Sequence, residues 1–267
     1  MTRPIRLAVQ IHPQHSPYGA LRDAAVEAEG RGADIVMNWD HFYPLSGEPE
    51  GLHFECWTQL ASFAEVTSRV ELGPLVTCNS YRNPNLLADM ARTVDHISGG
   101  RVILGLGAGW FEKDYIEYGY EFGTGPSRVA ALKRDLPIMK RRLEVLNPPP
   151  LRKMPILIGG GGEKVTLRIT AQHADIWHGF GDPAQIRHKC AVLDAHCAQV
   201  GRNPAEIERS AGVPLAHRED PAYGDTVVAA GATLLTFGIG GTNLDLSWFD
   251  RWVEWREESN AAPGARQ

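Results

Sequence analysis

The chain alternates between short apolar runs and longer amphipathic or alanine-rich segments along most of its length. We count about eight such alternations, and eight strand–helix units close a parallel barrel. The sequence therefore predicts an α/β fold, a (β/α)8 TIM barrel. An open doubly wound sheet is the alternative, but it normally carries a glycine-rich phosphate loop after its first strand. This chain has His12-Pro13-Gln14 at that point.

The boundaries follow from apolar periodicity and from glycine, proline and capping residues. We expect strands at 5–11, 33–37, 70–77, 101–104, 155–158, 174–177, 207–213 and 232–237. We expect helices near 19–31, 53–68, 85–97, 126–146, 163–173, 183–200, 221–230 and 243–257. With 267 residues, the chain fits one barrel domain over residues 1–258, followed by a disordered tail over 259–267.

The fourth strand is the most distinctive stretch, Arg101-Val-Ile-Leu-Gly-Leu-Gly-Ala-Gly-Trp110. Its apolar residues do not alternate with polar ones, which is typical of a parallel strand buried on both faces. Gly105, Gly107 and Gly109 occupy every second position after it. One face there carries no side chains, so a flat ligand could lie against the backbone. A glycine-punctuated strand end with no ligand is an equally good interpretation.

In a barrel, the functional site lies at the carboxyl ends of the strands. Asp40-His41 follows the second strand and pairs a carboxylate with a group that titrates near neutral pH. Short polar side chains after the third strand, among them Asn79, suggest hydrogen bonding to a heterocycle. Gly159 to Gly162 precede a predicted helix, and bare amides at a helix N-terminus bind anions such as phosphate. At the sixth strand, Asp175, Trp177 and His178 are further candidates for lining the pocket.

The net charge of the chain argues against some classes of binding partner. The chain has 27 basic and 32 acidic residues, a formal net charge of −5, whereas nucleic acids and anionic membranes require a basic surface. We therefore expect a small-molecule substrate, with no nucleic-acid or membrane partner. Four scattered cysteines without a CxxC motif, and the lack of a signal-like apolar run, predict a cytoplasmic protein.

A metal-dependent hydrolase is the alternative chemistry for histidines near strand ends. His12, His15, His41 and His178 all fall in such positions. Their spacing matches neither an H-x-H strand pair nor an H-E-x-x-H helix, and no acidic residue is placed as an obvious bridging ligand. We therefore expect no metal centre.

Four motifs in order along the chain together resemble the bacterial luciferase-like family, in particular its deazaflavin-dependent (coenzyme F420) branch. They are Asn38-Trp-Asp-His-Phe42, Val76-Thr77 with Tyr81-Arg-Asn-Pro84, the stretch Arg101–Trp110, and Pro155-Ile-Leu-Ile-Gly-Gly-Gly161. The resemblance covers nearly the whole chain. It implies a (β/α)8 barrel that binds coenzyme F420 or FMN at the strand ends and performs hydride transfer or flavin-dependent monooxygenation.

The resemblance also assigns roles to individual residues. It implies that Asp40 and Thr77 contact the deazaflavin, that Ala108-Gly109 pass their backbone against it, and that a bulge with a non-prolyl cis peptide lies behind the ring at Leu75–Val76. The glycines Gly160, Gly161 and Gly162 would hold the phosphate. His41 stands where sugar-phosphate dehydrogenases of the family keep a catalytic histidine, so we expect it to accept or donate a proton.

Two departures from the family pattern stand out. Trp110 replaces the catalytic glutamate of those dehydrogenases, which argues against sugar-phosphate oxidation, and a short connector over residues 147–154 replaces a longer insertion between the fourth helix and fifth strand. Three hypotheses remain: an F420-dependent oxidoreductase, an FMN-dependent monooxygenase, and a barrel that binds a cofactor without turnover. Barrels of this family often pair, so we expect a homodimer.

Overall fold

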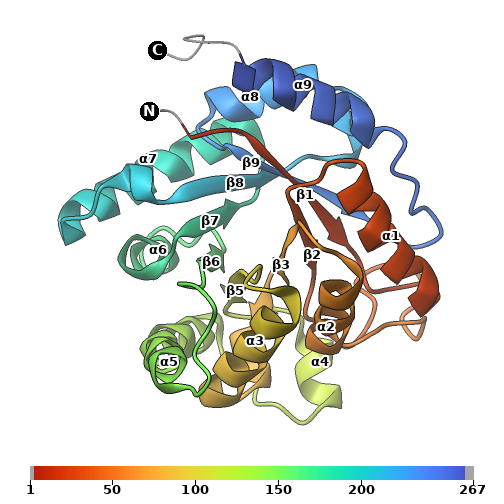
Figure 1. The fold of residues 1–267 in the computed structure, drawn as a ribbon. Coiled ribbons are helices and arrows are strands. Elements are labelled where there is room, and N and C mark those ends of the chain that lie inside the picture. Colours follow the sequence, from red (N-terminus) through yellow and green to blue (C-terminus); the bar gives the residue numbers. More distant parts are fainter. Residues whose placement is uncertain (1–2, 262–267) are drawn as a thin grey trace.

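The protein is a closed barrel of parallel strands wrapped by helices, as the computed structural model of residues 3–261 shows (Figure 1). Within these residues, nine strands form one sheet in the order β3-β2-β1-β9-β8-β7-β6-β5-β4. A parallel bridge between Leu72 and Val102 joins β3 to the residues before β5 and closes the sheet. The predicted TIM-barrel class is confirmed.

The strands are β1 (Arg6–Ile11), β2 (Ile35–Asn38), β3 (Glu71–Pro74), β4 (Thr77–Cys78), β5 (Leu104–Gly107), β6 (Ile156–Gly159), β7 (Ile176–Gly179), β8 (Glu208–Gly212) and β9 (Leu234–Ile239). The α-helices are α1 (Tyr18–Gly30), α2 (Cys56–Val66), α3 (Pro84–Ser98), α4 (Glu112–Glu117), α5 (Gly125–Val145), α6 (Thr166–His173), α7 (Pro183–Val200), α8 (Ala222–Ala229) and α9 (Phe249–Ala261).

The predicted third strand is interrupted, which is why nine strands make an eight-unit barrel. β3 pairs with β2, whereas β4 pairs with β5. Between them the chain bulges at Leu75–Val76, and this peptide bond is cis, as the family resemblance implied. The Leu75 carbonyl oxygen accepts a hydrogen bond of 2.7 Å from the Gln10 side chain of β1. The bulge therefore lies inside the barrel near the carboxyl ends of the strands.

The core has two parts. A small cluster inside the barrel includes Ala8, Ile35, Leu157 and Leu234, all fully buried. A larger cluster fills the layer between the strands and the surrounding helices. At the amino ends of the strands, Arg6 makes ion pairs with Glu71 and Glu208 across the barrel. Packing and ion pairing thus close one end, and the other is free to hold a ligand.

Several segments differ from the sequence-based boundaries; β5 begins at Leu104 rather than 101 and α2 at Cys56 rather than 53. The short helix α4 was not predicted, although Glu112 and Asp114 in its first turn are typical of a helix start. Helix α6 begins at Thr166 rather than Glu163, because residues 163–165 form a turn. Helix α9 begins six residues later than predicted, since the Asp245 side chain accepts hydrogen bonds from Ser247 and holds a turn there.

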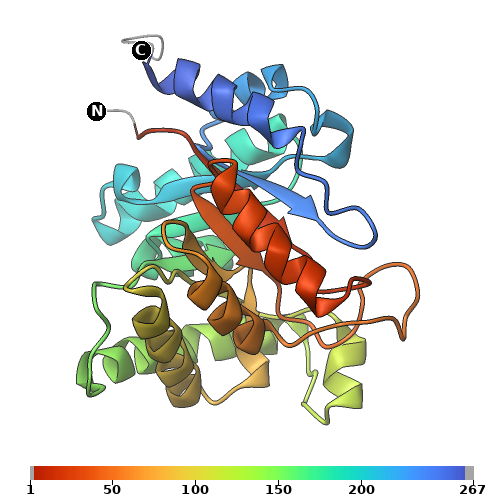
Figure 2. The ribbon, with the colours of Figure 1, turned by 45° about the vertical axis from the view of Figure 1, so that its right-hand side comes forward.

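The chain end departs from the prediction as well. Residues 259–261, expected to belong to a disordered tail, are the last residues of α9. The rest of the expected tail, 262–267, lies outside the described residues. In Figure 2, α4 and the loop between β2 and α2 lie on the side of the barrel away from both termini. That side carries the candidate site.

Candidate active site

A cavity of about 440 Å³ opens at the carboxyl ends of β1, β2, β5 and β6 and over the bulge between β3 and β4. Its volume lies within the range usual for small-molecule and cofactor sites. The lining residues are Gln10, Trp39, Asp40, His41, Leu45, Leu75, Val76, Cys78, Tyr81, Gly107, Ala108, Gly109, Trp110, Gly159, Gly160, Thr166 and Phe180. The cavity thus brings together Asp40, His41, Leu75, Val76, Ala108, Gly109 and Gly160 from the predicted set.

Gly107 and Gly109 line the cavity, and the glycines of β5 and β6 have a second role, which is to make room for the bulge. A Cβ on Gly107 would lie 2.5 Å from Val76 Cγ2, and one on Gly159 would lie 2.9 Å from Val76 Cγ1. A Cβ on Gly105 would overlap the Pro74 carbonyl oxygen. The missing side chains make room for the bulge, and the bulge in turn forms part of the cavity wall.

His41 is held by a buried carboxylate that sequence analysis missed. Its Nδ1 lies 2.7 Å from Asp114 Oδ2, and Asp114 is fully buried at the start of α4. Tyr81 donates its hydroxyl to the same oxygen at 3.0 Å. The other oxygen, Oδ1, accepts the backbone N–H groups of Phe42 and Tyr43 at 3.1 and 3.2 Å.

These contacts fix the tautomer of His41. Asp114 receives hydrogen bonds at both oxygens, as an ionised carboxylate does, so His41 Nδ1 must carry the proton that it shares with Asp114. Neutral His41 then presents the lone pair of Nε2. This nitrogen has no hydrogen-bond partner among residues 3–261, and His41 lines the cavity. The arrangement is that of a general base whose orientation is set by a second residue.

Aromatic rings surround His41. Trp39 stacks on His12 with ring centroids 4.1 Å apart, and its indole N–H donates to His53 Nε2 at 3.1 Å. Trp110 and Phe111 meet the His41 ring edge-on at 5.7 and 5.6 Å. Burial lowers the pKa of both His12 and His53 to about 4, so both are neutral at pH 7. The wall beside His41 is therefore uncharged and largely apolar.

Asp40 is buried and already engaged. Arg82 donates to both of its oxygens, at 2.6 and 2.9 Å, and the Cys78 backbone N–H donates to Oδ2 at 3.0 Å. Arg82 is also paired with Glu55. Burial raises the pKa of Asp40, and the ion pair with Arg82 opposes that rise. The carboxylate joins β4 and the chain before α3 to the cavity wall.

Thr77 and Asn79 do not line the cavity. Thr77 accepts a hydrogen bond from the Trp57 indole of α2 at 3.1 Å, on the outer side of the barrel. Asn79 donates to Asp135 of α5 at 2.9 Å, while its buried Oδ1 has no partner. Their expected roles as cofactor contacts stay predictions that would require side-chain movement.

The loop after β6 has unused backbone donors. The Gly160 N–H bonds to the His178 carbonyl, but those of Gly161 and Gly162 make no hydrogen bond within residues 3–261. Lys189 of α7 lies against Gly161 and pairs with Glu163 at 2.6 Å. Gly161 and Gly162 do not line the cavity itself, whereas Gly160 and Thr166 do. Free amides beside a lysine suit an anionic group next to the cavity.

At Ala108-Gly109 the backbone follows the cavity wall. Gly109 has φ +82°, and a Cβ there would overlap both Tyr115 Oη and Cys78 Sγ, so only glycine fits. Its carbonyl accepts a hydrogen bond of 3.1 Å from Arg128 of α5. This loop is therefore held at a fixed distance from the bulge.

The three candidates at the sixth predicted strand point elsewhere. Asp175 lies at the amino end of β7, where it pairs with Lys153 and accepts the Ile156 N–H. Trp177 packs in the outer core and donates to the Gly160 carbonyl at 2.9 Å. His178 points into the barrel and contacts Ser210 at 2.9 Å. None of the three lines the cavity.

The histidines considered for a metal centre are dispersed. His12 stacks on Trp39, His41 pairs with Asp114, His178 bonds to Ser210, and His15 contacts the Ser46 carbonyl at 2.6 Å. Within residues 3–261, no three His, Cys, Asp or Glu side chains lie close enough together to hold a metal ion.

Sequence analysis assigned no role to the cavity-lining residues Gln10, Trp39, Tyr81 and Phe180, nor to Asp114, which contacts His41 from outside the lining. Asp114 was detectable in part, because acidic residues near 112–114 signal a helix start after strand β5. Its pairing with His41 spans 73 positions and depends on how α4 docks. No local pattern encodes that contact.

The structure is a barrel with a cavity at its strand ends. A cis-peptide bulge and a histidine held by a carboxylate bound this cavity. Comparison with known proteins identifies the family that has this architecture. Residues 2–236 match the model of the luciferase-like monooxygenase family. The chain belongs to this family and is an enzyme of it.

Curated relatives include a monooxygenase and an F420-dependent dehydrogenase. Pyrimidine monooxygenase RutA of Stutzerimonas stutzeri is 30% identical over 216 residues, which cover 72% of this chain and 59% of the relative. The F420-dependent glucose-6-phosphate dehydrogenase of Kineococcus radiotolerans is 27% identical over 244 residues, covering 82% of this chain and 70% of the relative. The chain thus spans less than two thirds of the length of the first of these relatives.

Solved structures share the fold at low identity. An F420-dependent secondary alcohol dehydrogenase in complex with an F420-acetone adduct matches with a TM-score of 0.86 at 15% identity, covering 95% of this chain and 99% of that one. The coenzyme F420-dependent tetrahydromethanopterin reductase of Methanopyrus kandleri matches with a TM-score of 0.72 at 17% identity, covering 95% and 97%. Separately, no helix within residues 3–261 combines the length and apolar character needed to cross a bilayer.

Proposed function

We propose that this enzyme is an oxidoreductase that uses coenzyme F420 to move a hydride to or from a small organic substrate bearing a hydroxyl or carbonyl group. The observation that carries the proposal is the His41–Asp114 pair at the cavity. When a hydride leaves the carbon of an alcohol, the hydroxyl must lose a proton, and His41 Nε2 is placed to take it. In the reverse direction, protonated His41 returns the proton to the carbonyl oxygen.

The residues present fit a deazaflavin. Leu75 and Val76 offer an apolar surface to a flat ring, and the cavity volume suits such a group. Gly161 and Gly162 have free amides beside Lys189 for an anionic tail. When bound, a deazaflavin supplies a carbon that gives or accepts a hydride, while FMN can also react with oxygen.

Other side chains near His41 have separate roles in the proposed reaction. Asp114 and Tyr81 hold His41 in one tautomer and one orientation, so they are positioning residues. Trp39 and Trp110 flank the His41 ring edge-on. Among the described residues that line the cavity, none is lysine or arginine, which favours an uncharged substrate over a sugar phosphate.

The cofactor assignment is tested by side-by-side titration of the purified protein with oxidised coenzyme F420 and with FMN, following the quenching of tryptophan fluorescence. We expect saturable binding of both, with the deazaflavin bound at least about tenfold more tightly. Preference for FMN, or no saturable binding of the deazaflavin, would contradict the proposal.

An FMN-dependent monooxygenase is the second candidate, favoured by the 30% identity to pyrimidine monooxygenase RutA. It predicts that the protein, purified from a flavin-containing host, retains FMN and consumes oxygen with NAD(P)H-reduced flavin. Family membership supports both enzymes over a barrel that binds a cofactor without turnover. The cytoplasmic location and the homodimer stay predictions.

A further inference from the structure

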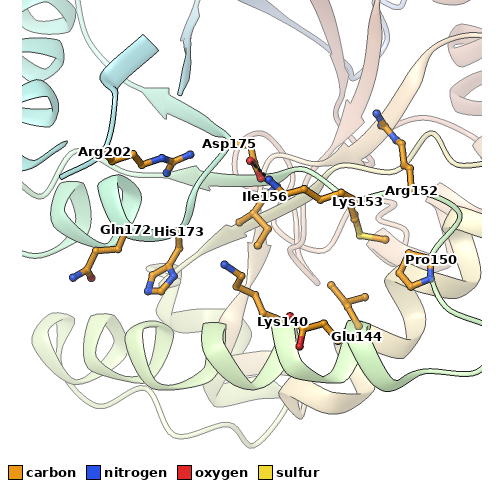
Figure 3. Close-up of a pocket in the computed structure, with 12 residues that line it drawn as sticks. Lys140, Glu144, Pro150, Arg152, Lys153, Ile156, Gln172, His173, Asp175 and Arg202 are labelled. Atoms are coloured by element: carbon orange, nitrogen blue, oxygen red, sulfur yellow. Dashed lines mark hydrogen bonds and ion pairs between the residues drawn. The ribbon is translucent and has the colours of Figure 1, made fainter. Parts of the chain in front are cut away.

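A second cavity lies at the opposite end of the barrel from the catalytic cavity. It measures about 570 Å³ and sits between α5, α6 and the amino ends of β6 and β7. Ile156, the first residue of β6, and His173, the last residue of α6, mark its position. Figure 3 shows Lys140 rising from α5 into this space while Arg202 extends toward it from the far side. The proposed hydride-transfer chemistry does not involve this cavity.

The lining is strongly basic, although the chain as a whole is acidic. Four lining side chains are cationic and two are acidic, an excess of two positive charges in a protein of net charge −5. The cations are Lys140, Arg152, Lys153 and Arg202. They come from three separate segments, namely α5, the connector before β6 and the turn after α7. Cations brought together by the fold generate a local field that attracts anions.

Part of this charge is uncompensated. Lys140 has no hydrogen bond or ion pair among residues 3–261. Arg202 pairs with Glu206 and donates to the Ala171 carbonyl, which leaves its Nη2 without a partner among these residues. Lys153 pairs with Asp175, but its side chain is 84% exposed and is free to turn to a ligand. Arg152 is committed to Glu71. The positive field reaches His173, whose pKa is lowered by burial and then by Lys140 and Arg202.

Apolar side chains line the same cavity beside these cations. Leu143, Pro150, Met154 and Ile156 line the cavity, and Met154 and Ile156 are buried at 5% exposure. A ligand that contacts both the cationic and the apolar side chains of the cavity needs a negatively charged end and an apolar body. A phosphate monoester carries about two negative charges near pH 7, so it would draw on Lys140, on the exposed Lys153 and on the unused Nη2 of Arg202. Guanidinium and ammonium groups are the side chains that bind phosphate most effectively.

We propose that this cavity is a second small-molecule site that binds an organic phosphate monoester, with the phosphate between Lys140, Lys153 and Arg202 and the apolar part against Leu143 and Met154. The site is independent of the proposed hydride-transfer function, because the two cavities share no lining residue.

Isothermal titration calorimetry with 1-naphthyl phosphate tests the proposal, with inorganic phosphate and 1-naphthol as probes of the charged and apolar halves. We expect one saturable site for 1-naphthyl phosphate, bound at least about tenfold more tightly than either half. The same result is expected with saturating FMN or coenzyme F420 present. No saturable binding, or equal affinity for 1-naphthol, would overturn the proposal.

Variants locate the site. Lys140→Gln combined with Arg202→Gln should weaken binding of 1-naphthyl phosphate at least about tenfold. Because Arg202 also pairs with Glu206 and donates to the Ala171 carbonyl, circular dichroism checks that the double variant is folded, and Lys140→Gln alone should weaken binding as well. Arg141→Gln is the matched control, since Arg141 is the next cation on α5 but does not line the cavity. Trp110→Ala, in the catalytic cavity, should also leave the affinity unchanged. Equal affinity in the double variant and the Arg141→Gln control would overturn the assignment.

Discussion

His41 Nδ1 and Asp114 Oδ2 lie 2.7 Å apart, although the two residues are separated by 73 positions in the chain. His41 follows β2, and Asp114 stands in the first turn of α4 after β5. The contact orients the His41 ring and leaves Nε2, the proton acceptor that we propose, without a partner among the described residues.

Asp114→Asn should lower kcat by about 10²- to 10⁴-fold with a small change in KM, because an amide can donate to Nδ1 and so reverse the tautomer of His41. The measurement is steady-state turnover of a confirmed substrate, with cofactor affinity determined in parallel. Glu112→Gln, an exposed acid in the same turn of α4, is the control and should keep full activity. Equal rates for Asp114→Asn and wild type would remove Asp114 from the mechanism.

Gly107→Ala should destabilise the protein by about 1–3 kcal/mol, because the new methyl group meets Val76 Cγ2 at 2.5 Å. Urea unfolding measures the change. Adding Val76→Ala should recover part of the loss by removing the opposing methyl groups. Gly30→Ala is the matched control, since a Cβ there has nothing within 4 Å. If Gly107→Ala is as stable as Gly30→Ala, Val76 of the bulge does not pack tightly against Gly107, and the account of the bulge is contradicted.

Trp110→Ala should raise KM for the organic substrate several-fold and leave the free energy of unfolding within about 0.5 kcal/mol of wild type, since the side chain is 62% exposed. Its edge-on contact with His41 places it beside the reacting end of the cavity. Initial-rate kinetics and urea unfolding provide the two readouts. An unchanged KM would mean that Trp110 does not contact the substrate.

Stability should fall as the pH drops from about 6.5 to about 4. Burial lowers the pKa of His178 in the folded protein to about 4, whereas an unfolded histidine titrates near 6.5. Between these values the unfolded chain binds a proton that the folded protein does not, so acidification favours unfolding. The loss is complete below about pH 4 and amounts to roughly 3 kcal/mol at most for this group.

Urea unfolding at pH 7, 6, 5 and 4.5 measures this slope. His178→Asn should be less stable at pH 7 but should show a shallower decline on acidification. His12 and His53 have similarly lowered pKa values and keep part of the slope. His188→Asn is the control, because the His188 side chain is 61% exposed. An identical slope in His178→Asn and wild type would contradict the buried neutral state of His178.

The barrel could be predicted because local residue patterns mark where each strand and helix begins and ends. Apolar strands such as 156–159 end at glycines, and helices such as α7 begin with an Asp182 capping box and end at Gly201. Such signals depend only on residues close in sequence. The bulge that interrupts the third strand at Leu75–Val76 was expected only from the family resemblance, since nothing in residues 70–77 alone marks where pairing passes from β2 to β5.

The site was predictable only in outline. His41 and Asp40 were found because the barrel places strand ends together, but the partners that hold them, Asp114 and Arg82, depend on tertiary docking. Gly107 lines the cavity, but the space beside its Cα is taken by Val76, which no local pattern indicated. A glycine in the sequence does not show whether a cofactor or another part of the protein occupies the space beside it.

The most direct test of the central claim is single-turnover absorbance of bound coenzyme F420 with His41→Ala and wild type. The oxidised cofactor is mixed with a panel of uncharged alcohols, and the reduced cofactor with the matching carbonyl compounds. We predict that wild type changes the cofactor absorbance with at least one pair and that His41→Ala slows this change about 10²- to 10⁴-fold at unchanged cofactor affinity. Equal rates in both proteins, with the cofactor fully bound, would contradict it.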